Sequence, residues 1–522
     1  MAISDYKEIL IQNQYNMFQW YPFEEQSSIL EICLNDEDEG VKINQFTKIV
    51  REIREIKENE SYDYLIIIGD LKKIDNAFDR LINLTNETGK ILIITDNQLS
   101  VKSMCQNKNT EQLYNRKEID EKLDKLGLIN RKYYYMFPDY KNANVIFTDK
   151  HKPNIDTISR NITFFSEDVV VIFPENERLK EIIEQDDSLV RIFANSFFIE
   201  CSKKKFEDNN IEFVSYSNMR KERYKIQTII KDEKVYKTNV NEKAREHIEN
   251  VKRNIDILKE NHIATLDSYN GDTIISEYQR ENKPVDALLI DKLLNNQKQE
   301  AIDFIKIFYE NLKEKLQLTN YEKNVFEKYD IQYNEKEIAN LHFVKHGLWD
   351  LTFQNSFYIN NTFYFYDQEW YEENVPVEFI MYRANLYCKQ LQNYIEENVF
   401  YEITGIKEEN IRIFRELDNI LQLNIRNAKA WKIHTSINTI EKIKNQMEQL
   451  KTEKEQFTED CMKLLNEKDA RIKFLEDNMK STCELLKQKE MVIDQMENSM
   501  SWKITKPLRY IRGARKEQKN EN

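Results

Sequence analysis

Residues Thr435 to Met500 contain neither glycine nor proline, and apolar residues recur among them every three or four positions. This spacing buries one stripe of a helix against another helix. The stripe comprises Ile440, Ile443, Met447, Leu450, Phe457, Cys461 and Leu464, and after a four-residue shift Ile472, Leu475, Met479, Leu486, Ile493, Met496 and Met500. We therefore predict a long coiled coil over 435–500 that joins copies of the chain. Because Lys454 and Thr482 interrupt the stripe, a solvated single helix is the alternative.

The residues after this helix, 501–522, contain seven lysines and arginines but only two glutamates. Trp502, Leu508 and Tyr510 are interleaved with the basic residues. Aromatic and aliphatic side chains between cations suit an anionic membrane surface, where rings sit at the depth of the headgroups. We expect a basic amphipathic tail that binds such a surface, with a solvated basic tail as the alternative.

The scarcity of glycine excludes two common phosphate-binding loops. The chain has 522 residues but only 8 glycines, and the closest pair, Gly69 and Gly89, is too widely spaced for G-x-G-x-x-G or G-x-x-x-x-G-K-[ST]. A formal net charge of −14 disfavours a surface that coats nucleic acid, so we expect no nucleic-acid partner. Six scattered cysteines and no apolar run of about 20 residues predict a cytoplasmic protein, peripheral at the inner face of the cell membrane.

Short Ile-rich runs bounded by polar residues predict buried strands in the first part of the chain. They lie at 28–34, 64–70, 90–96 and 144–149. We assign 1–165 to an α/β domain and 166–211 to a connecting segment. Residues 212–430 read as a strand-rich lobe followed by a helical lobe. The predicted fold class is therefore multidomain, α/β plus α+β, ending in the coiled coil at 435–500 and the tail at 501–522.

The most specific chemical pattern is Asp350 and Asn355, with four residues between them, followed by Asp367 after a strand-like run. Phosphoryl transfer needs a carboxylate beside the incoming hydroxyl, and an amide oxygen plus a second carboxylate to hold Mg²⁺ on the nucleotide phosphates. We predict that Asp350 accepts the hydroxyl proton while Asn355 and Asp367 hold the metal.

A lysine on an upstream strand could complete this site. Lys237 lies on a predicted strand, and Glu246 and Glu249 lie on the helix that follows. A strand lysine paired with a helix glutamate is the usual clamp on the α- and β-phosphates of ATP. We take Glu249 as the partner of Lys237 and leave Glu246 open.

On these residues, 212–401 resembles the protein kinase-like superfamily, in particular the aminoglycoside and choline phosphotransferase branch. The resemblance implies a bilobal domain that binds ATP and Mg²⁺, with Glu277 in the hinge that contacts the nucleotide. Three positions depart from the pattern. Ser217–Arg220 replaces the glycine-rich loop, Leu348 replaces the usual histidine before the catalytic aspartate, and Gln368-Glu369 follows the metal-binding aspartate.

The first part of the chain resembles class I S-adenosylmethionine-dependent methyltransferases of bacterial surface-polysaccharide genes. Trp20–Phe23 and the Ile-rich runs carry the resemblance. The family binds its cofactor at a glycine-rich turn after the first strand, but here Asn35–Gly40 carries four carboxylates. The 28 residues from Asp36 to Asp63 are also too few for two βα units, each of about 30 residues. We expect a truncated Rossmann-like domain that lacks the ribose-binding strand and does not bind S-adenosylmethionine.

Taken together, the chain is similar to proteins that modify or cap bacterial O-antigen-type glycans. The resemblance implies a surface glycan or its lipid-linked precursor as substrate, glycosyltransferases as partners and a coiled-coil homo-oligomer. The first hypothesis is a transferase that phosphorylates the glycan. The second is a non-catalytic coiled-coil scaffold for glycosyltransferases at the membrane, and the third is an active methyltransferase acting on a glycan.

Overall fold

The computed structural model describes residues 13–36, 38, 40–57, 60–105, 110–154, 158, 174–319 and 323–509. The chain divides into two compact units, Met1–Ser436 and Ile437–Asn522, which are treated separately below. No helix in the described ranges is both long enough and apolar enough to cross a membrane.

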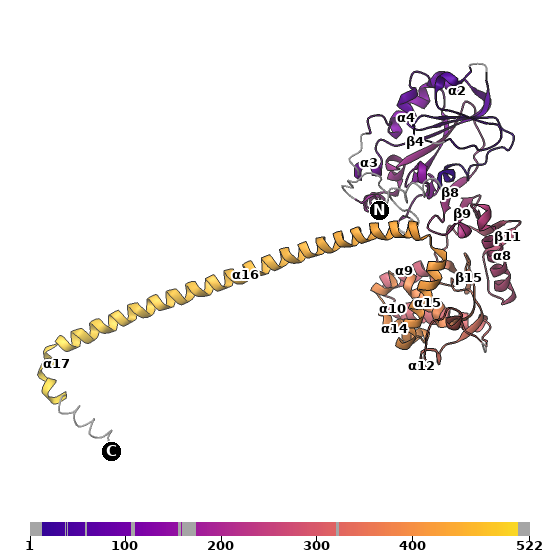
Figure 1. The fold of residues 1–522 in the computed structure, drawn as a ribbon. Helices are drawn as coiled ribbons and strands as arrows, with labels where there is room; N and C mark the ends of the chain where they lie inside the picture. The colour runs from indigo at the N-terminus through magenta and orange to yellow at the C-terminus, as the bar shows by residue number, and fades with distance from the viewer. Residues whose placement is uncertain are drawn as a thin grey trace. The chain divides into compact units, whose positions relative to one another are not determined.

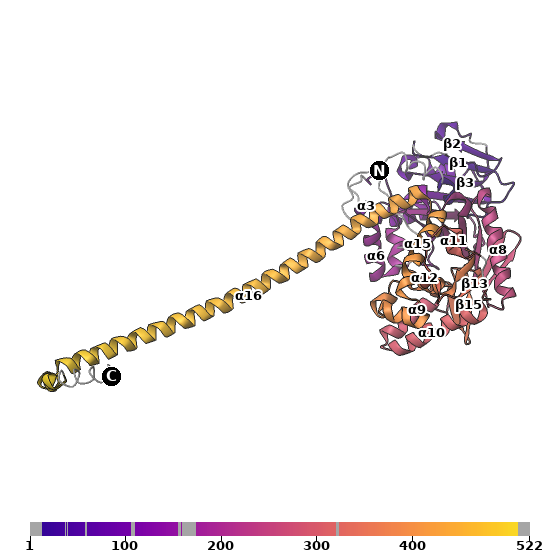
Figure 2. The ribbon, with the colours of Figure 1, turned by 60° about the horizontal axis from the view of Figure 1, so that its bottom comes forward.

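A 12-stranded sheet forms the centre of the first unit, in the order β11-β12-β10-β9-β8-β6-β5-β7-β4-β3-β1-β2. Seven of its strands belong to the N-terminal half: β1 (Ile29–Cys33), β2 (Thr47–Val50), β3 (Tyr62–Ile68), β4 (Thr85–Asp96), β5 (Asn130–Phe137), β6 (Val145–Phe147) and β7 (Ser196–Ser202). The first four strands are parallel, whereas β7 runs antiparallel between β4 and β5. The segment expected to be a connector, 166–211, therefore supplies a central strand of this half. Figure 2 shows β1, β2 and β3 side by side.

The central parallel strands are buried on both faces, which explains why they read as continuous apolar runs. Short helices flank this half: α2 (Phe78–Ile82), α3 (Val101–Cys105), α4 (Arg116–Lys125), α6 (Glu175–Gln185) and α7 (Val190–Phe193). The side chain of Asn115 caps α4 and Glu118 returns the bond, so this helix begins with a complete capping box.

The expectation that the strand beside β1 is missing was wrong. β2 pairs with β1 in parallel, from Ile29 opposite Thr47 to Ile32 opposite Val50. A four-residue strand needs far less chain than a full βα unit, because no α-helix occurs between β1 and β2 in the described residues.

The same sheet continues into the second half without interruption. Strand β6 pairs with β8, and Val145 lies opposite Ser215. The remaining strands are β8 (Ile211–Tyr216), β9 (Ile226–Lys231), β10 (Lys234–Asn239), β11 (Asp267–Asn270) and β12 (Thr273–Glu277). Helix α8 (Arg245–Glu260) contacts β10, β11 and β12, and Figure 1 shows it beside these strands.

A helical lobe follows. Its helices are α9 (Val285–Leu294), α10 (Lys298–Lys315), α11 (Val325–Lys328), α12 (Glu335–Ile338), α13 (Val377–Tyr387), α14 (Glu397–Thr404) and α15 (Glu408–Ile425). Two small antiparallel sheets insert between them: β13 (Phe343–Gly347) with β16 (Glu372–Pro376), and the hairpin of β14 (Ser356–Ile359) and β15 (Thr362–Phe365). A core of aromatic and aliphatic residues that includes Phe308, Phe326 and Phe353 holds this lobe together.

The C-terminal residues form one continuous helix, α16 (Ala428–Asn498), followed by the short α17 (Met500–Ile504). From residue 446 to residue 498 every side chain of α16 is exposed, including the apolar stripe. The described part of the predicted coiled coil is therefore a helix with an uncovered apolar stripe. The tail beyond residue 509 lies outside the described residues.

Candidate functional site

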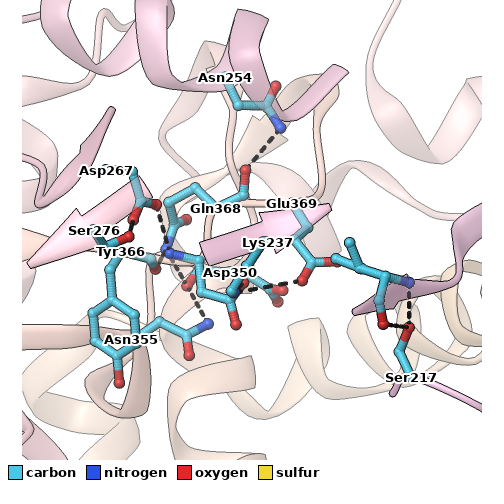
Figure 3. A network of polar contacts seen from close by, with 12 residues as sticks. Ser217, Lys237, Asn254, Asp267, Ser276, Asp350, Asn355, Tyr366, Gln368 and Glu369 are labelled. Atoms are coloured by element: carbon cyan, nitrogen blue, oxygen red, sulfur yellow. Dashed lines mark hydrogen bonds and ion pairs between the residues drawn. The ribbon is translucent and has the colours of Figure 1, made fainter. Parts of the chain in front are cut away.

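Four separate segments bring the expected phosphotransfer residues to one place (Figure 3). Lys237 comes from β10, Asp350 follows β13, Asn355 ends the short 3₁₀ helix after it, and Asp367 follows β15. Hydrogen bonds fasten two of the segments together. The side-chain amide of Asn355 donates to the backbone oxygen of Asp350 at 3.2 Å, and that of Gln368 donates to the same oxygen at 3.0 Å. Because its nitrogen is used, Asn355 keeps its amide oxygen for another ligand.

Lys237 forms an ion pair with Asp367 and lies 3.9 Å from a carboxylate oxygen of Glu369. The backbone at Asp367 has φ = 59°, a left-handed conformation uncommon for any residue except glycine. Its N–H donates to a carboxylate oxygen of Asp267 at 2.8 Å, and this oxygen's carboxyl group also accepts from Ser276. This strained turn directs the carboxylate of Asp367 towards the lysine.

The pKa values in this pair follow from burial and charge. Partial burial and the neighbouring Glu369 raise the pKa of Asp367 to about 7, although Lys237 opposes the shift. Burial alone would lower the pKa of Lys237, but Asp367 and Glu369 more than offset this effect and raise it. Lys237 is therefore protonated at neutral pH, and its positive charge favours the ionised form of Asp367.

Glu369 is the carboxylate with the most charged partners in the site. In the sequence it was noted only as part of Gln368-Glu369, which stands where kinase-like proteins often have Phe-Gly after the metal-binding aspartate. Its buried carboxylate pairs with Arg220 and accepts a hydrogen bond from Nε2 of His247 at 3.1 Å. Burial would raise the pKa of Glu369, but Arg220, His247 and Lys237 together hold it well below its usual value. Glu369 thus joins groups from β10, α8 and the loop before β9.

Asp350 has its own cation. Arg383 on α13 lies 3.0 Å from Asp350, pairs with Asp418 as well, and stacks over the ring of Trp349 at 4.2 Å. Desolvation raises the pKa of Asp350 in spite of Arg383. The predicted base is therefore already held in one orientation by a buried guanidinium group.

Helix α8 presents a different face to the site from the one we expected. Glu249 is 49% exposed and pairs with Lys252 at 2.6 Å, and Glu246 is also exposed. The structure therefore does not bring either glutamate to Lys237. The apolar stripe of α8, with Ile248 and Val251, places His247 on the buried side, so helical phase was the signal that could have found it.

Glu277 ends β12 at the expected hinge. Its backbone lies opposite Lys234 of β10, and its side chain is 65% exposed. The structure thus puts the backbone of Glu277 in the strand next to Lys237 and its carboxylate in solvent.

The loop that replaces the glycine-rich loop is tied to the helical lobe. Arg220 forms an antiparallel bridge with Arg426, the N–H of Lys221 donates to Ile425 at 2.9 Å, and that of Asn427 donates to Met219 at 2.8 Å. A phosphate-binding loop has to approach its ligand closely with free N–H groups. Here the loop is instead clasped to the segment between α15 and α16, which holds Arg220 over the acidic cluster.

A methyltransferase would bind its cofactor at the C-terminal ends of β1 and β3. In this chain, residues that follow β1 pack over that strand. Glu31 is fully buried in β1 and accepts the N–H of Val41 at 2.8 Å. Asp38 is buried as well and accepts from the hydroxyl of Tyr140 at 3.0 Å, with Lys141 at 3.6 Å. Asp38, one of the four carboxylates of Asn35–Gly40, is therefore folded inward.

Glu31 is incompletely satisfied in this position. Its second carboxylate oxygen is buried and has no hydrogen-bond partner. Desolvation raises the pKa of Glu31 to about 7, against the effect of its bond to Val41. Gly40 leaves no room for further atoms, because a Cβ there would lie 2.4 Å from Ile49. The residues present do not fit S-adenosylmethionine, since packed side chains and an unsatisfied carboxylate occupy this edge.

The two halves of this unit thus share one sheet, with the parallel strands in the N-terminal half and Lys237, Asp350, Asn355 and Asp367 in the second half. No protein-family model matches the sequence, and no curated protein sequence does either. Among solved structures, a phosphoethanolamine N-methyltransferase 2 from Haemonchus contortus is similar over 39% of this chain and 57% of its own length, with 14% identity and a TM-score of 0.22. This chain thus spans just over half the length of that methyltransferase.

Two further solved structures are also similar to the chain. The aminoglycoside phosphotransferase APH(2'')-Ib, solved with ADP, shares 12% identity over 41% of this chain and 88% of its own, with a TM-score of 0.21. WbdD shares 10% identity over 83% of this chain and 92% of its own, with a TM-score of 0.21. Because all three TM-scores are far below 0.5, we base no conclusion on these similarities.

Proposed function

We propose that the kinase-like half transfers a phosphoryl group from ATP to a hydroxyl of a bacterial surface glycan or its lipid-linked precursor. The single observation that supports this proposal is the convergence of Lys237, Asp350, Asn355 and Asp367 from four segments at one place. A carboxylate for the hydroxyl, and an amide oxygen and a carboxylate for Mg²⁺, are the groups that this reaction needs.

Each residue has a distinct task in this proposal. Asp350, oriented by Arg383, accepts the proton of the attacking hydroxyl. Asn355 and Asp367 hold Mg²⁺, which when bound neutralises charge on the nucleotide phosphates. Lys237 must move from Asp367 to the phosphates for Asp367 to reach the metal, because the carboxylate and the lysine now neutralise each other. In this proposal, the ion pair between Lys237 and Asp367 is thus present before nucleotide and metal bind.

Radiolabelled ATP tests the proposal directly. Purified full-length protein with Mg-ATP and the surface glycan of its own strain should label the glycan. Asp350→Asn should lower the rate by about 10²–10⁴-fold, the usual contribution of a general base. Glu314→Gln, at an exposed position of α10, is the matched control and should retain the wild-type rate. Equal labelling by wild type and Asp350→Asn would refute the assignment.

The exposed stripe of α16 favours a second candidate, a scaffold for glycosyltransferases. A helix with exposed apolar residues at heptad spacing buries them against copies of itself. In this proposal the chain is a homo-oligomer whose basic tail, beyond residue 501, binds the inner face of the cell membrane. Membrane release on deletion of 437–522, with no change in glycan synthesis in the Asp367→Ala variant, would favour the scaffold over the enzyme.

The two cysteines of α16 report how copies of the helix align. Cys461 falls on the apolar stripe and Cys483 falls beside it, and both are exposed in the single chain. In a parallel, in-register pair the two Cys461 residues face each other, so mild oxidation should cross-link wild type and Cys483→Ser but not Cys461→Ser. Cross-linking only through Cys483, or none under conditions where the chain is oligomeric, would exclude this alignment.

A further inference from the structure

A cavity with a volume of about 650 Å³ lies beside Glu369. Its walls come from the loop before β9, from α8 and from the residues after Asp367. Volumes of about 300–1,000 Å³ are typical of small-molecule sites. His247 and Glu369 belong both to this cavity and to the charged cluster, so the two sites share one wall.

One side of the cavity is a fixed aromatic column. The ring of Trp370 stacks on His247 at 4.8 Å and on Trp349 at 5.8 Å, and Tyr224 meets it edge-on at 5.2 Å. Side chains packed on both faces cannot rotate freely, so the column offers a preorganised apolar surface. Tyr371 extends this surface at the next position of the chain.

The charges at the cavity are unevenly compensated. Glu369 is neutralised by the cations described above, Glu372 is bound by Lys328 and by the hydroxyl of Tyr329, and Glu373, which also lines the cavity, interacts with Tyr371. By contrast, no carboxylate in the described residues pairs with Arg223 or Arg253. Arg223 lies over the ring of Tyr224 at 4.7 Å, and Arg253 donates to the side-chain oxygen of Asn250. Two exposed guanidinium groups at the rim therefore remain available to an anion.

We propose that this cavity binds an anionic sugar residue, one that carries a carboxylate or a phosphate. The guanidinium groups of Arg223 and Arg253 take the anion, since planar guanidinium matches both oxyanions. The aromatic column takes the apolar face of the ring, and the amides of Asn250 and Asn424 reach its hydroxyls. The identification of the ligand as a sugar rests on the proposed function, and it makes the cavity a glycan subsite beside the phosphotransfer site.

Ligand-observed NMR titration of the full-length protein tests this assignment. The probes are methyl glucuronide, glucose 6-phosphate, methyl glucoside and inorganic phosphate. At least one anionic sugar should bind about tenfold more tightly than methyl glucoside, because charge-assisted hydrogen bonds contribute that much. The tighter of the two anionic sugars shows whether the natural anion is a carboxylate or a phosphate.

Variants locate the binding. The preference for the anionic sugar should disappear in the double variant Arg223→Gln/Arg253→Gln and persist in Arg245→Gln, an exposed arginine of α8 that does not line the cavity. Equal affinity for charged and neutral sugars, inorganic phosphate as tight as glucose 6-phosphate, or an unchanged preference in the double variant would each overturn the proposal. The comparison among probes on the wild type holds even if the double variant fails to fold.

The titration contains no ATP, so its result is independent of catalysis. Binding of anionic sugars by a protein that never labels a glycan would refute the proposed function and leave the cavity assignment standing. Labelling of a glycan by a protein that shows no preference for anionic sugars would do the reverse.

Discussion

The two halves of the first unit differ in what fills the place where we looked for a cofactor. At the end of β1, the chain around Asp38 and Val41 packs onto Glu31, so backbone and side chains fill the space. Around Lys237, the space is closed by ion pairs, with Lys237 on Asp367 and Arg220 on Glu369. A packed edge opens only by local unfolding, whereas ion pairs can exchange partners with a charged ligand. Among the described residues, charged groups therefore close the second half, and packed backbone and side chains close the first.

The largest effect on stability should follow from breaking the charged closure. Glu369→Gln removes the anion shared by Arg220, His247 and Lys237, and breaking a buried ion pair costs about 3–5 kcal/mol. Urea unfolding should show this loss, while the exposed control Glu373→Gln should stay within about 0.5 kcal/mol of wild type. A loss below about 1 kcal/mol would mean that water already reaches these pairs and that the comparison fails.

The packed residues around Glu31 should instead make the free energy of unfolding depend on pH. The pKa of Glu31 is about 7 in the folded protein against 4.5 for an unperturbed carboxyl, so the folded state holds the proton more tightly. The contribution of Glu31 to stability is therefore largest at low pH and falls by roughly 3 kcal/mol as pH rises from about 4.5 to 7. Gln mimics the protonated form, so Glu31→Gln should match wild type at pH 5 and exceed it at pH 8.

Unfolding curves of both proteins at pH 5, 6, 7 and 8 make this measurement. The exposed Glu52→Gln serves as the control and should follow the wild-type pH dependence. Parallel curves for wild type and Glu31→Gln would show that the carboxylate at the end of β1 is solvated or paired, and the two closures would then be alike.

The smallest effect is a difference between two ligands. A ligand at about 100 times its dissociation constant adds about 2.7 kcal/mol to the stability of the state that binds it. Mg-ATP should raise the melting temperature of the full-length protein, and S-adenosylmethionine should leave it unchanged. A saturable shift with S-adenosylmethionine would show that the residues around Asp38 open, and no shift with Mg-ATP would show that the ion pairs of the cleft do not exchange.

Much of the architecture could be predicted from the sequence, because strands buried on both faces appear as continuous Ile-rich runs. β1 and β6 lie within these runs, and β3 and β4 overlap them. The role of α8 was harder to predict. Glu249 has the residue type that a kinase uses, but the phase of the helix turns it outward and turns His247 inward. We based that prediction on residue type, but the helical periodicity of α8 was the better signal.

Glu369 illustrates the other difficulty. Read along the chain, it is one acidic residue two positions after Asp367, and nothing local distinguishes it from Glu372 or Glu373. Its importance arises from Arg220 and His247, which lie more than 100 positions away and meet it only in the folded protein. The expectation of a missing strand beside β1 failed for a related reason, since a chain of given length can place a short strand in more than one way.

The amino-acid sequence by itself determined where most strands and helices form, where the long helix runs, and which residues, Lys237, Asp350, Asn355 and Asp367, are candidates for phosphotransfer. Those properties follow from backbone periodicity and residue type, which act locally. The tertiary structure alone decided which acid meets which base, which edge is filled, and which two arginines have no carboxylate partner in the described part of the chain. Such outcomes depend on which distant side chains lose their water together, and the free energy of a charge depends on those neighbours more than on its place in the chain.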